Sequence, residues 1–532
     1  MVPLEELTFP QLLMRTAKRC GQRPAVWYRS ETMTYNRLAR QVEAYGAALC
    51  AGGIRKGDHV AIWADNSPET LISFYAVMSV GAVAVMLNTS LTQHEITELL
   101  AFSDSKALIL GALRNTEPDC VRLHSLIQQL PFLQNVYTIP GAACQAFPSL
   151  TEAAERVTPE DKAQFCLSAR AVRPADTAAM LFTSGSSGKC KGVLTSHYSR
   201  VNSGIQQAAD LGACEEDRFC AVLPMFHCFA VSANLLACLS AGGCLCIPES
   251  SRSRAVAETI REAGCTIFNA VPTLYFALMR RSEYTSDMFV TLRTGIIGGA
   301  GYSSEDFVRI NNHFHMTLLS SLGQTETTAG STVSRPDDTL EVRSTTLGRF
   351  MSHVEGKIVD LKTGQTLPDG EIGEICIRGY LVMQGYYRQN ALTAETIDAD
   401  GWLHTGDLGS LDENGLLTLH GRCKELIIRG GENISPVEIE QAVCTLPQVA
   451  GCKVIGVPDS HFGEEICACV VLREGAGLSA EELRRGLKDR LAHYKIPAYI
   501  LFWDSLPMNA TGKIDLTAVR ERAGRELGRK GD

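Results

Sequence analysis

The chain has 532 residues, of which 45% are hydrophobic and 20% charged, and its formal net charge is −9. This length allows two or three domains, and the composition is ordinary for a globular protein. The acidic balance, with no basic stripe, argues against a nucleic-acid partner. A small anionic ligand stays open, because a single loop can be locally positive.

The 19 cysteines are scattered along the chain, and several lie in apolar runs. None forms paired C-x-x-C knuckles with zinc spacing, so we expect reduced, mostly buried thiols of a cytoplasmic protein. The apolar stretch from Phe219 to Pro248 contains proline, glycine and polar residues. It favours strand, loop, helix (about Val231–Leu239) and strand (Cys244–Ile247) over a membrane span. Attachment to a membrane surface and formation of a homodimer stay open.

Strands and helices alternate through the first 110 residues. The periodicity predicts helices over 10–19, 35–49, 68–78 and 92–102, with strands over 25–28, 60–64, 82–87 and 107–110. Such alternation predicts a mainly parallel sheet covered on both faces. The segment from Glu117 to Thr158 has weaker signals and is predicted to be a long surface connection.

A loop rich in glycine and hydroxyl groups, Thr183–Gly192, joins two predicted strands over 178–182 and 193–196. It contains three glycines, four hydroxyl side chains and two lysines. Glycines let backbone N–H groups approach closely, hydroxyls donate hydrogen bonds and lysines offset charge, so the loop suits a phosphate chain. Its spacing is not that of the Walker loop, and a strand follows instead of a helix. Alone, the loop is equally compatible with a flexible hairpin.

Further along the chain, a predicted strand over 292–297 ends in Gly298-Gly299-Ala300-Gly301, where open α/β sheets bind ligands. Another strand, over 317–320, leads into Ser321–Thr327. After about Pro336, short strands separated by Asp-Gly and Asn-Gly turns predict a small antiparallel sheet or barrel. From Gly421 onward, strands and helices indicate a separate α+β unit.

The order of these motifs resembles the adenylate-forming superfamily of acyl-CoA synthetases, peptide-synthetase adenylation domains and luciferases. The resemblance covers essentially the whole chain and is closest to the fatty acyl-CoA synthetases, through Pro224–Phe229, Ser334–Asp338 and Leu347-Gly348-Arg349. It implies an α/β fold with a large N-terminal domain (1–422) of doubly covered, mainly parallel sheets and a β-barrel-like part at about 337–422. A small mobile α+β C-terminal domain (423–532) would follow, hinged at Lys424.

The resemblance implies an ATP-dependent ligase in which a carboxylate attacks the α-phosphate of ATP and coenzyme A then displaces AMP. ATP, Mg²⁺ and coenzyme A are the implied cofactors, and a medium- or long-chain fatty acid is the favoured substrate. The alternatives are an aryl- or bile-acid-type CoA ligase, an enzyme that loads a carrier protein, and a catalytically dead nucleotide-binding relative.

The resemblance also assigns residues to the nucleotide. The phosphate-loop residues are Thr183, Ser184, Gly185, Ser186, Ser187, Gly188 and Lys191. Glu326 is the implied Mg²⁺ ligand, since one carboxylate with phosphates and water is the usual arrangement for this ion. Thr325 is assigned to the α-phosphate, and Gly299, Ala300 and Gly301 to the adenine.

Two positions depart from the family pattern. Leu322, directly before Gly323, stands where an aromatic residue usually stacks on adenine, so an apolar wall remains without ring stacking. Cys190 stands where proline usually precedes the Lys191-Gly192 pair, so we expect a less rigid loop.

Several further assignments have structural alternatives. Asp407 is expected on the ribose hydroxyls or is simply a turn aspartate, and Arg422 contacts the ribose or α-phosphate or forms a junction salt bridge. His227 borders the acyl pocket or is a hydrogen-bonded core histidine.

The C-terminal assignments rest on the resemblance alone. Lys513, in Ala510–Ile514, would bridge the attacking carboxylate and the α-phosphate. Lys424 would be the hinge between the two half-reactions. Gly430 and Gly431 would line the pantetheine tunnel, with a plain glycine turn as the alternative.

Overall fold

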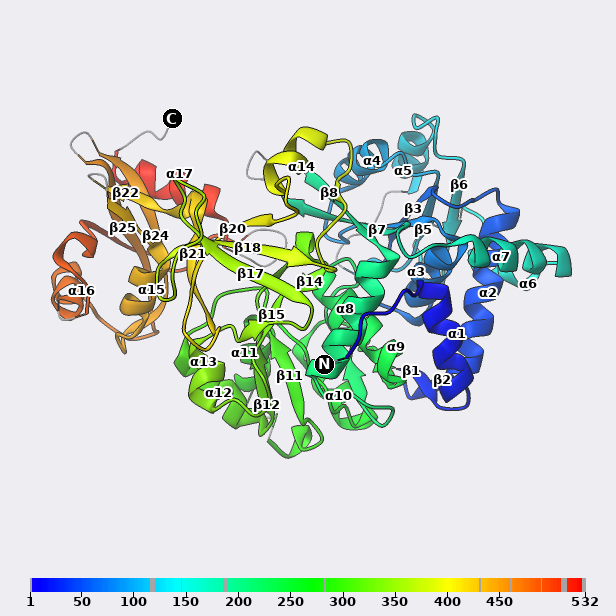
Figure 1. Ribbon diagram of the computed structural model, residues 1–532, viewed down its shortest axis with the longest axis horizontal. Helices are drawn as coiled ribbons and strands as arrows, with labels where there is room; N and C mark the ends of the chain where they lie inside the picture. Colours follow the sequence, from blue (N-terminus) through cyan, green and yellow to red (C-terminus); the bar gives the residue numbers. More distant parts are fainter. Residues whose placement is uncertain are drawn as a thin grey trace. The chain divides into compact units, whose positions relative to one another are not determined.

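The computed structural model describes residues 2–114, 120–144, 146–184, 190–281, 284, 286–429, 432–459, 462–488, 490–508 and 514–528 (Figure 1). The chain divides into two compact units. Unit 1 comprises 1–355 and 377–403, and unit 2 comprises 356–376 and 404–532. None of the described helices is both long enough and apolar enough to cross a membrane.

A seven-stranded sheet forms one layer of unit 1, in the order β19-β8-β7-β4-β3-β5-β6. Its strands are β3 (His59–Trp63), β4 (Val83–Met86), β5 (Ala107–Leu110), β6 (Asn135–Thr138), β7 (Thr177–Ser184), β8 (Cys190–Ser196) and β19 (Gly385–Tyr386). The strands from β7 to β6 run parallel, whereas β8 and β19 join antiparallel at one edge. The predicted mainly parallel sheet is therefore confirmed.

Helices pack around this sheet and against one another. They include α1 (Phe9–Cys20), α2 (Tyr35–Ala51), α3 (Pro68–Val80), α4 (Gln93–Phe102), α7 (Pro159–Ala171) and α8 (His197–Asp210). Pro68 occupies the first turn of α3 and the Ser67 hydroxyl accepts from Thr70 N, as the sequence predicts for a helix start. Every residue of α3 except Glu69 is buried, so this helix lies inside the molecule.

A second sheet in unit 1 has the order β2-β1-β10-β9, formed by β1 (Pro24–Tyr28), β2 (Glu31–Thr34), β9 (Arg218–Cys220) and β10 (Cys244–Cys246). Isolated bridges through Ile267 connect β9 to β11 (Thr294–Ile297), which pairs in parallel with β12 (Thr317–Ser320). The segment 266–270 takes part in this arrangement only through isolated bridges. Its neighbours α10 (Ser253–Ala263), α11 (Pro272–Met279) and α12 (Ser304–Phe314) complete this part.

The segment predicted as a long surface connection contains regular elements. They are α5 (Cys120–Ile127), β6 at the sheet edge and α6 (Leu150–Glu155). Each is short, and β6 gains its stability by pairing with β5, so periodicity within the segment gives little sign of it. The prediction was wrong for these stretches.

The helix predicted over about 231–239 begins as a π-helix, η1 (Ala230–Leu236), and continues as α9 (Ala237–Ala241). A π-helix is rare and usually occurs as a short insertion at functional sites. All seven residues of η1 are buried, which agrees with a core position and not with a membrane span.

Unit 2 carries two sheets. The first is an open four-stranded sheet, β17-β18-β20-β21, built from β17 (Val354–Val359), β18 (Gly373–Gly379), β20 (Leu403–Leu411) and β21 (Leu417–Arg422), the first three of which extend into unit 1. The second contains β22 (Ile427–Arg429), β23 (Glu432–Ile434), β24 (Val449–Asp459), β25 (Gly463–Leu472) and β26 (Tyr499–Phe502). Helices α15 (Pro436–Cys444), α16 (Ala480–Leu487) and α17 (Leu516–Glu526) accompany it, which confirms the predicted α+β character.

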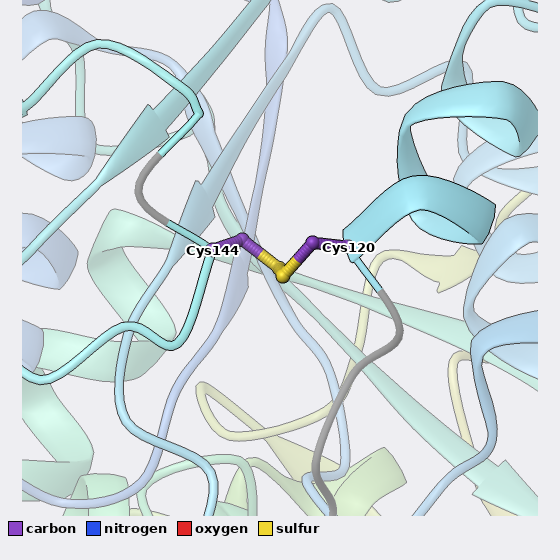
Figure 2. The surroundings of a disulfide bond; sticks show 2 residues. All are labelled: Cys120 and Cys144. Carbon is purple, nitrogen blue, oxygen red and sulfur yellow. A yellow bond between two sulfur atoms is a disulfide. The ribbon is translucent and has the colours of Figure 1, made fainter.

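Cys120 and Cys144 form a disulfide, so the expectation that every cysteine is reduced was wrong (Figure 2). Cys120 begins α5 and Cys144 lies in the loop after β6, and their Cα atoms are 5.4 Å apart. The pair lies in the segment that was predicted to be a long surface connection, so no predicted elements brought the two cysteines together. The other cysteines are free thiols, most of them buried.

Candidate active site

The predicted phosphate loop joins two paired strands of unit 1. Thr183 on β7 lies opposite Lys191 on β8, and Ser184 lies opposite Cys190. The side chain of Ser184 and the residues Gly185, Ser186, Ser187 and Gly188 lie outside the described residues. The described ends of the loop thus form an antiparallel hairpin that brings Thr183 and Lys191 together.

Gly192, just after the loop, has a steric role. A Cβ there would lie 2.9 Å from the Met180 sulfur, so a side chain at this position would displace the core under the hairpin.

Lys191 and Glu326 both contact the side chain of Tyr386. The Lys191 Nζ lies 4.9 Å from the centre of the Tyr386 ring, and the Tyr386 hydroxyl donates a 2.9 Å hydrogen bond to Glu326 Oε1. Burial and the Glu326 carboxylate raise the pKa of Tyr386, so it stays a donor at neutral pH. Strand β19, paired with β8, therefore places a tyrosine between the loop lysine and the predicted metal ligand.

Glu326 lies in a single 3₁₀ turn, η3 (Thr325–Thr327), after the short strand β13 (Gly323–Gln324). Its carbonyl accepts from Met383 N at 2.8 Å. The turn ends at Thr328, whose φ of 59° is unusual for a β-branched residue. Thr325 Oγ1 contacts Cys228 Sγ at 3.7 Å. Thr325 and Glu326 are half-buried, so both stay accessible to a small ligand.

The residues predicted to line the adenine follow neighbouring strands. Strands β11 and β12 run parallel with Ile297 opposite Ser320. Gly299–Gly301 and Leu322 therefore leave the same edge of the sheet. Gly299, Ala300 and Gly301 are exposed, and Gly299 has a φ of 80°.

The backbone around Leu322 is closely held. Its carbonyl accepts from Ser331 N at 2.7 Å, and its N–H donates to the Thr332 hydroxyl. A Cβ at Gly323 would lie 2.2 Å from the Ala329 carbonyl, so only glycine fits between Leu322 and the strand that follows η3. The half-buried Leu322 side chain offers an apolar surface without a ring.

His227 lies half-buried in the loop before η1, with its ring 4.6 Å from that of Phe226. Asn66 holds this loop in place: its side-chain amide donates to the Ala221 and Leu223 carbonyls and accepts from Met225 N. A fixed loop next to Cys228, which contacts Thr325, places His227 near the turn that bears Glu326.

In unit 2, Asp407 and Arg422 face each other across β20 and β21. Arg422 Nε lies 3.0 Å from Asp407 Oδ1. The Asp407 residue is 5% exposed, whereas the Arg422 side chain is 62% exposed. Glu374 accepts from Gly406 N at 2.9 Å and so fixes the backbone before Asp407. Lys424 lies in the turn η4 (Cys423–Glu425). Gly430, Gly431 and Lys513 lie outside the described residues.

Two residues escaped the sequence reasoning. Tyr386 lies in a two-residue strand, too short for any periodicity to indicate. Arg200 is buried on α8 and donates to the Thr328 carbonyl. It is the only lysine or arginine between His197 and Asp210, but α8 also contains many other polar residues, so no sequence pattern marks Arg200 as buried.

Two protein-family models match this chain, one in its N-terminal part and one in its C-terminal part. The family model described as "AMP-binding enzyme" matches residues 13–387. The model described as "AMP-binding enzyme C-terminal domain" matches residues 438–513. Together the two models span the loop, η3 and the predicted C-terminal lysine.

Among similar proteins is the putative acyl-CoA synthetase YngI of Bacillus subtilis, 35% identical over 98% of each chain. The human mitochondrial medium-chain acyl-CoA ligase ACSF2 is 31% identical over 98% of this chain and 89% of its own. The ATP-bound crystal structure of MatB from Rhodopseudomonas palustris has a TM-score of 0.88 at 27% identity and covers 98% of this chain and all of its own. The o-succinylbenzoate CoA synthetase MenE of Bacillus subtilis, solved with its acyl-adenylate intermediate, has a TM-score of 0.80 at 29% identity, with coverage of 99% and 100%.

Proposed function

We propose that this chain activates a medium- or long-chain fatty acid. The chain belongs to the AMP-binding enzyme family and is an AMP-forming acid–CoA ligase. In the first half-reaction a carboxylate oxygen bonds to the α-phosphorus of ATP, and the bond from that phosphorus to the bridging oxygen breaks, which releases pyrophosphate. In the second, the thiolate sulfur of coenzyme A bonds to the acyl carbon and AMP leaves.

The observation that carries the adenylation proposal is the Lys191–Tyr386–Glu326 cluster. An anion must attack a polyanion, so the site needs positive charge and a metal-binding carboxylate at the same place. The hairpin supplies Thr183 and Lys191, and η3 supplies Thr325 and Glu326. Tyr386 contacts both the lysine and the carboxylate, so the two sets lie within one side chain of each other.

The donor chemistry at η3 fits Mg²⁺. This ion takes one or two carboxylates and completes its shell with water and phosphate oxygens, and Glu326 is a half-buried carboxylate held by a neutral donor. Mg²⁺ bound there would offset phosphate charge. The chain itself orients the carboxylate through Tyr386 and fixes the turn through Met383 N.

For unit 2 we propose that Asp407 accepts the ribose hydroxyls, since a nearly buried carboxylate beside an exposed arginine is a strong, fixed acceptor. Arg422 would then contact the ribose or α-phosphate. Lys513 is proposed to bridge the acid and the α-phosphate. Lys424 is proposed as the hinge and Gly430-Gly431 as the pantetheine surface, with the functional boundary at residues 422 and 423.

A fatty acid is favoured over a small or charged acid by the residues around His227. Val231 and Leu235 are 0% and 1% exposed, and Phe226 and Phe229 pack against the same core. The aryl acids named for structural neighbours, anthranilate and o-succinylbenzoate, make an aryl-acid ligase the second candidate.

The test is pyrophosphate release from ATP over a panel of carboxylic acids, with and without coenzyme A. The panel includes saturated acids of four to eighteen carbons, benzoate, anthranilate and a bile acid. We expect release with medium or long saturated acids and acyl-CoA only when coenzyme A is present. Preference for an aryl acid would favour the second candidate, and Glu326→Gln serves as the inactive control.

A further inference from the structure

Arg200, in the first turn of α8, is a buried arginine with incomplete pairing. It is 1% exposed, its Nε donates to Thr195 Oγ1 at 2.8 Å and its Nη1 donates to the Thr328 carbonyl at 3.3 Å. Its Nη2 is buried without a hydrogen-bond partner among the described residues. Within the same residues no carboxylate forms an ion pair with it.

This arrangement is poor for stability. Removing a guanidinium from water is costly unless a counter-ion and a full set of hydrogen bonds replace the water. Burial lowers the pKa of Arg200 to about 10, so the side chain remains charged at neutral pH. An apolar side chain of similar length would fill the same space at no electrostatic cost. A buried charge that weakens the fold points to a role in the site next to it.

Arg200 connects the two elements that carry the site. On one side, the Thr195 hydroxyl that accepts from it donates onward to the Ala179 carbonyl, which joins β8 to β7. On the other side, the Thr328 carbonyl accepts from Arg200 and from Ser232 Oγ at 2.9 Å. The guanidinium thus links the hairpin below the phosphate loop to the end of the η3 turn.

The turn needs such support because Thr328 has a φ of 59°. A β-branched residue disfavours this conformation, which persists only when its surroundings hold it. Thr328 N donates to the Thr325 carbonyl, so a change at Thr328 moves the turn that presents Thr325 and Glu326.

We propose that Arg200 is a positioning residue for acyl-adenylate formation, which holds Thr328 and thereby fixes Thr325 and Glu326 relative to the phosphate loop. Its charge adds positive potential beneath a site that binds a polyanion, because its Nη1 donates to the carbonyl of Thr328, directly after the η3 turn. The expected effect of Arg200 on the rate of adenylation rests on the proposed function. Its expected effect on the η3 turn rests on the fold alone.

The kinetic test compares Arg200→Met and Arg200→Lys with wild type in pyrophosphate exchange. Displacement of catalytic groups by a fraction of an ångström to 1 Å costs up to about a hundredfold. We expect kcat for adenylation to fall about tenfold to a hundredfold in Arg200→Met, with a changed Mg²⁺ dependence and a KM for the acid within about twofold of wild type. Arg200→Lys keeps the charge and should recover part of the loss. The melting temperature of Arg200→Met should be equal to or higher than that of wild type.

Arg343→Met is the matched control. Arg343 is also buried, but it donates to the Leu318 and Asp338 carbonyls and Asn311, away from η3. Its loss should lower the melting temperature while the folded enzyme keeps the wild-type Mg²⁺ dependence. If Arg200→Met lost activity only in proportion to a lowered melting temperature, or lost none, the proposal would be overturned.

A substrate-free measurement separates this proposal from the function. Hydrogen exchange of the backbone amides of 323–332 should accelerate about tenfold or more in Arg200→Met and remain unchanged in Arg343→Met. Unchanged exchange in Arg200→Met would refute the positioning role whatever the enzyme does. A wild-type protein that released no pyrophosphate with any acid would instead refute the proposed function.

Discussion

The hydroxyl of Tyr386 donates a hydrogen bond to the carboxylate of Glu326, the predicted metal ligand. Tyr386→Phe would keep the ring beneath Lys191 and remove only the donor to Glu326. A hydrogen bond to a charged group contributes about 1.5–3 kcal/mol. We therefore expect kcat/KM for MgATP in pyrophosphate exchange to fall about tenfold to a hundredfold.

Tyr387→Phe is the control for that substitution, because the Tyr387 hydroxyl donates a 2.7 Å hydrogen bond to a different carboxylate, that of Asp104. It should leave the MgATP kinetics within about twofold of wild type, since losses away from a site are small. Equal kinetic damage in both variants would show that the Tyr386 contact is merely structural.

Asp210 offers a pH test at the same scale. Burial raises its pKa to about 7, with Arg335 opposing the shift, and its Oδ2 has no partner among the described residues. Between the unfolded pKa near 3.8 and the folded value, the unfolded chain ionises and the folded one does not. The contribution of Asp210 to the free energy of unfolding therefore decreases as pH rises from about 4 to 7 and stays constant above that.

Asp210→Asn removes this titration. We expect it to raise the free energy of unfolding by about 2–4 kcal/mol at pH 8 and to change it little at pH 4. Urea denaturation at the two pH values measures the difference. The same gain at both values would contradict the assigned pKa.

At the scale of elements, α8 and η1 pack without room for a side chain at their crossing. A Cβ at Gly204 would lie 2.5 Å from Leu236 Cβ and 2.8 Å from its carbonyl carbon. Backbone cannot yield as a flexible side chain does, so Gly204→Ala should destabilise the protein by about 1–3 kcal/mol. Chemical denaturation measures it.

Gly477→Ala provides the comparison, because a Cβ there meets nothing within 4 Å. Its effect should stay within about 0.5 kcal/mol. If Gly204→Ala lowered the free energy of unfolding by no more than Gly477→Ala, the close approach of α8 and η1 would be contradicted.

Periodicity predicted most elements of unit 1, because strands buried on both faces read as apolar runs and α1, α2 and α8 have apolar faces. It failed where stability comes from partners distant in sequence. Strand β6 exists because β5 is beside it, and the π-helical part of 230–236 depends on packing against α8. A hydrophobic pattern cannot distinguish a π-helix from an α-helix over seven residues.

The site was predictable where chemistry is concentrated in short motifs. The loop composition and the Thr325-Glu326 pair pointed to neighbouring groups. The structure brings Lys191 and Glu326 to one side chain, Tyr386, with Thr183 opposite Lys191. The sequence could not indicate Tyr386 or the Arg200 link, because their contacts join residues that are 60 positions apart (Tyr386 and Glu326) and 128 positions apart (Arg200 and Thr328). The roles of Lys513, Gly430 and Gly431 remain predictions.

For the whole molecule, the two half-reactions place different demands on the C-terminal lysine. Lys513→Ala should abolish adenylation, since the positive charge is needed when the acid meets the α-phosphate. It should leave transfer of a supplied acyl-adenylate to coenzyme A within about threefold of wild type. Single-turnover assays of each half-reaction measure both, and equal loss in the two would contradict the assignment.

The disulfide allows a prediction about the thiol content and stability of the whole molecule. Denatured but unreduced protein should titrate seventeen thiols, the number of free cysteines, and two more after reduction of Cys120–Cys144. The bridge closes a sequence separation of 24 residues, so its reduction should cost up to about 3 kcal/mol of unfolding free energy. Nineteen thiols before reduction would show the pair to be open.

The boundary between the two units passes through the chain at 355/356, 376/377 and 403/404, and these points lie inside β17, β18 and β20 respectively. A protease that cut at any one of these points would break a strand, and at least one of the two fragments would contain parts of both units. A cut after Lys424 would free the remainder as one piece, with its sheet of β22 to β26 complete. The segment beyond Lys424 therefore carries a complete sheet of its own, whereas β17, β18 and β20 each contain residues of both units.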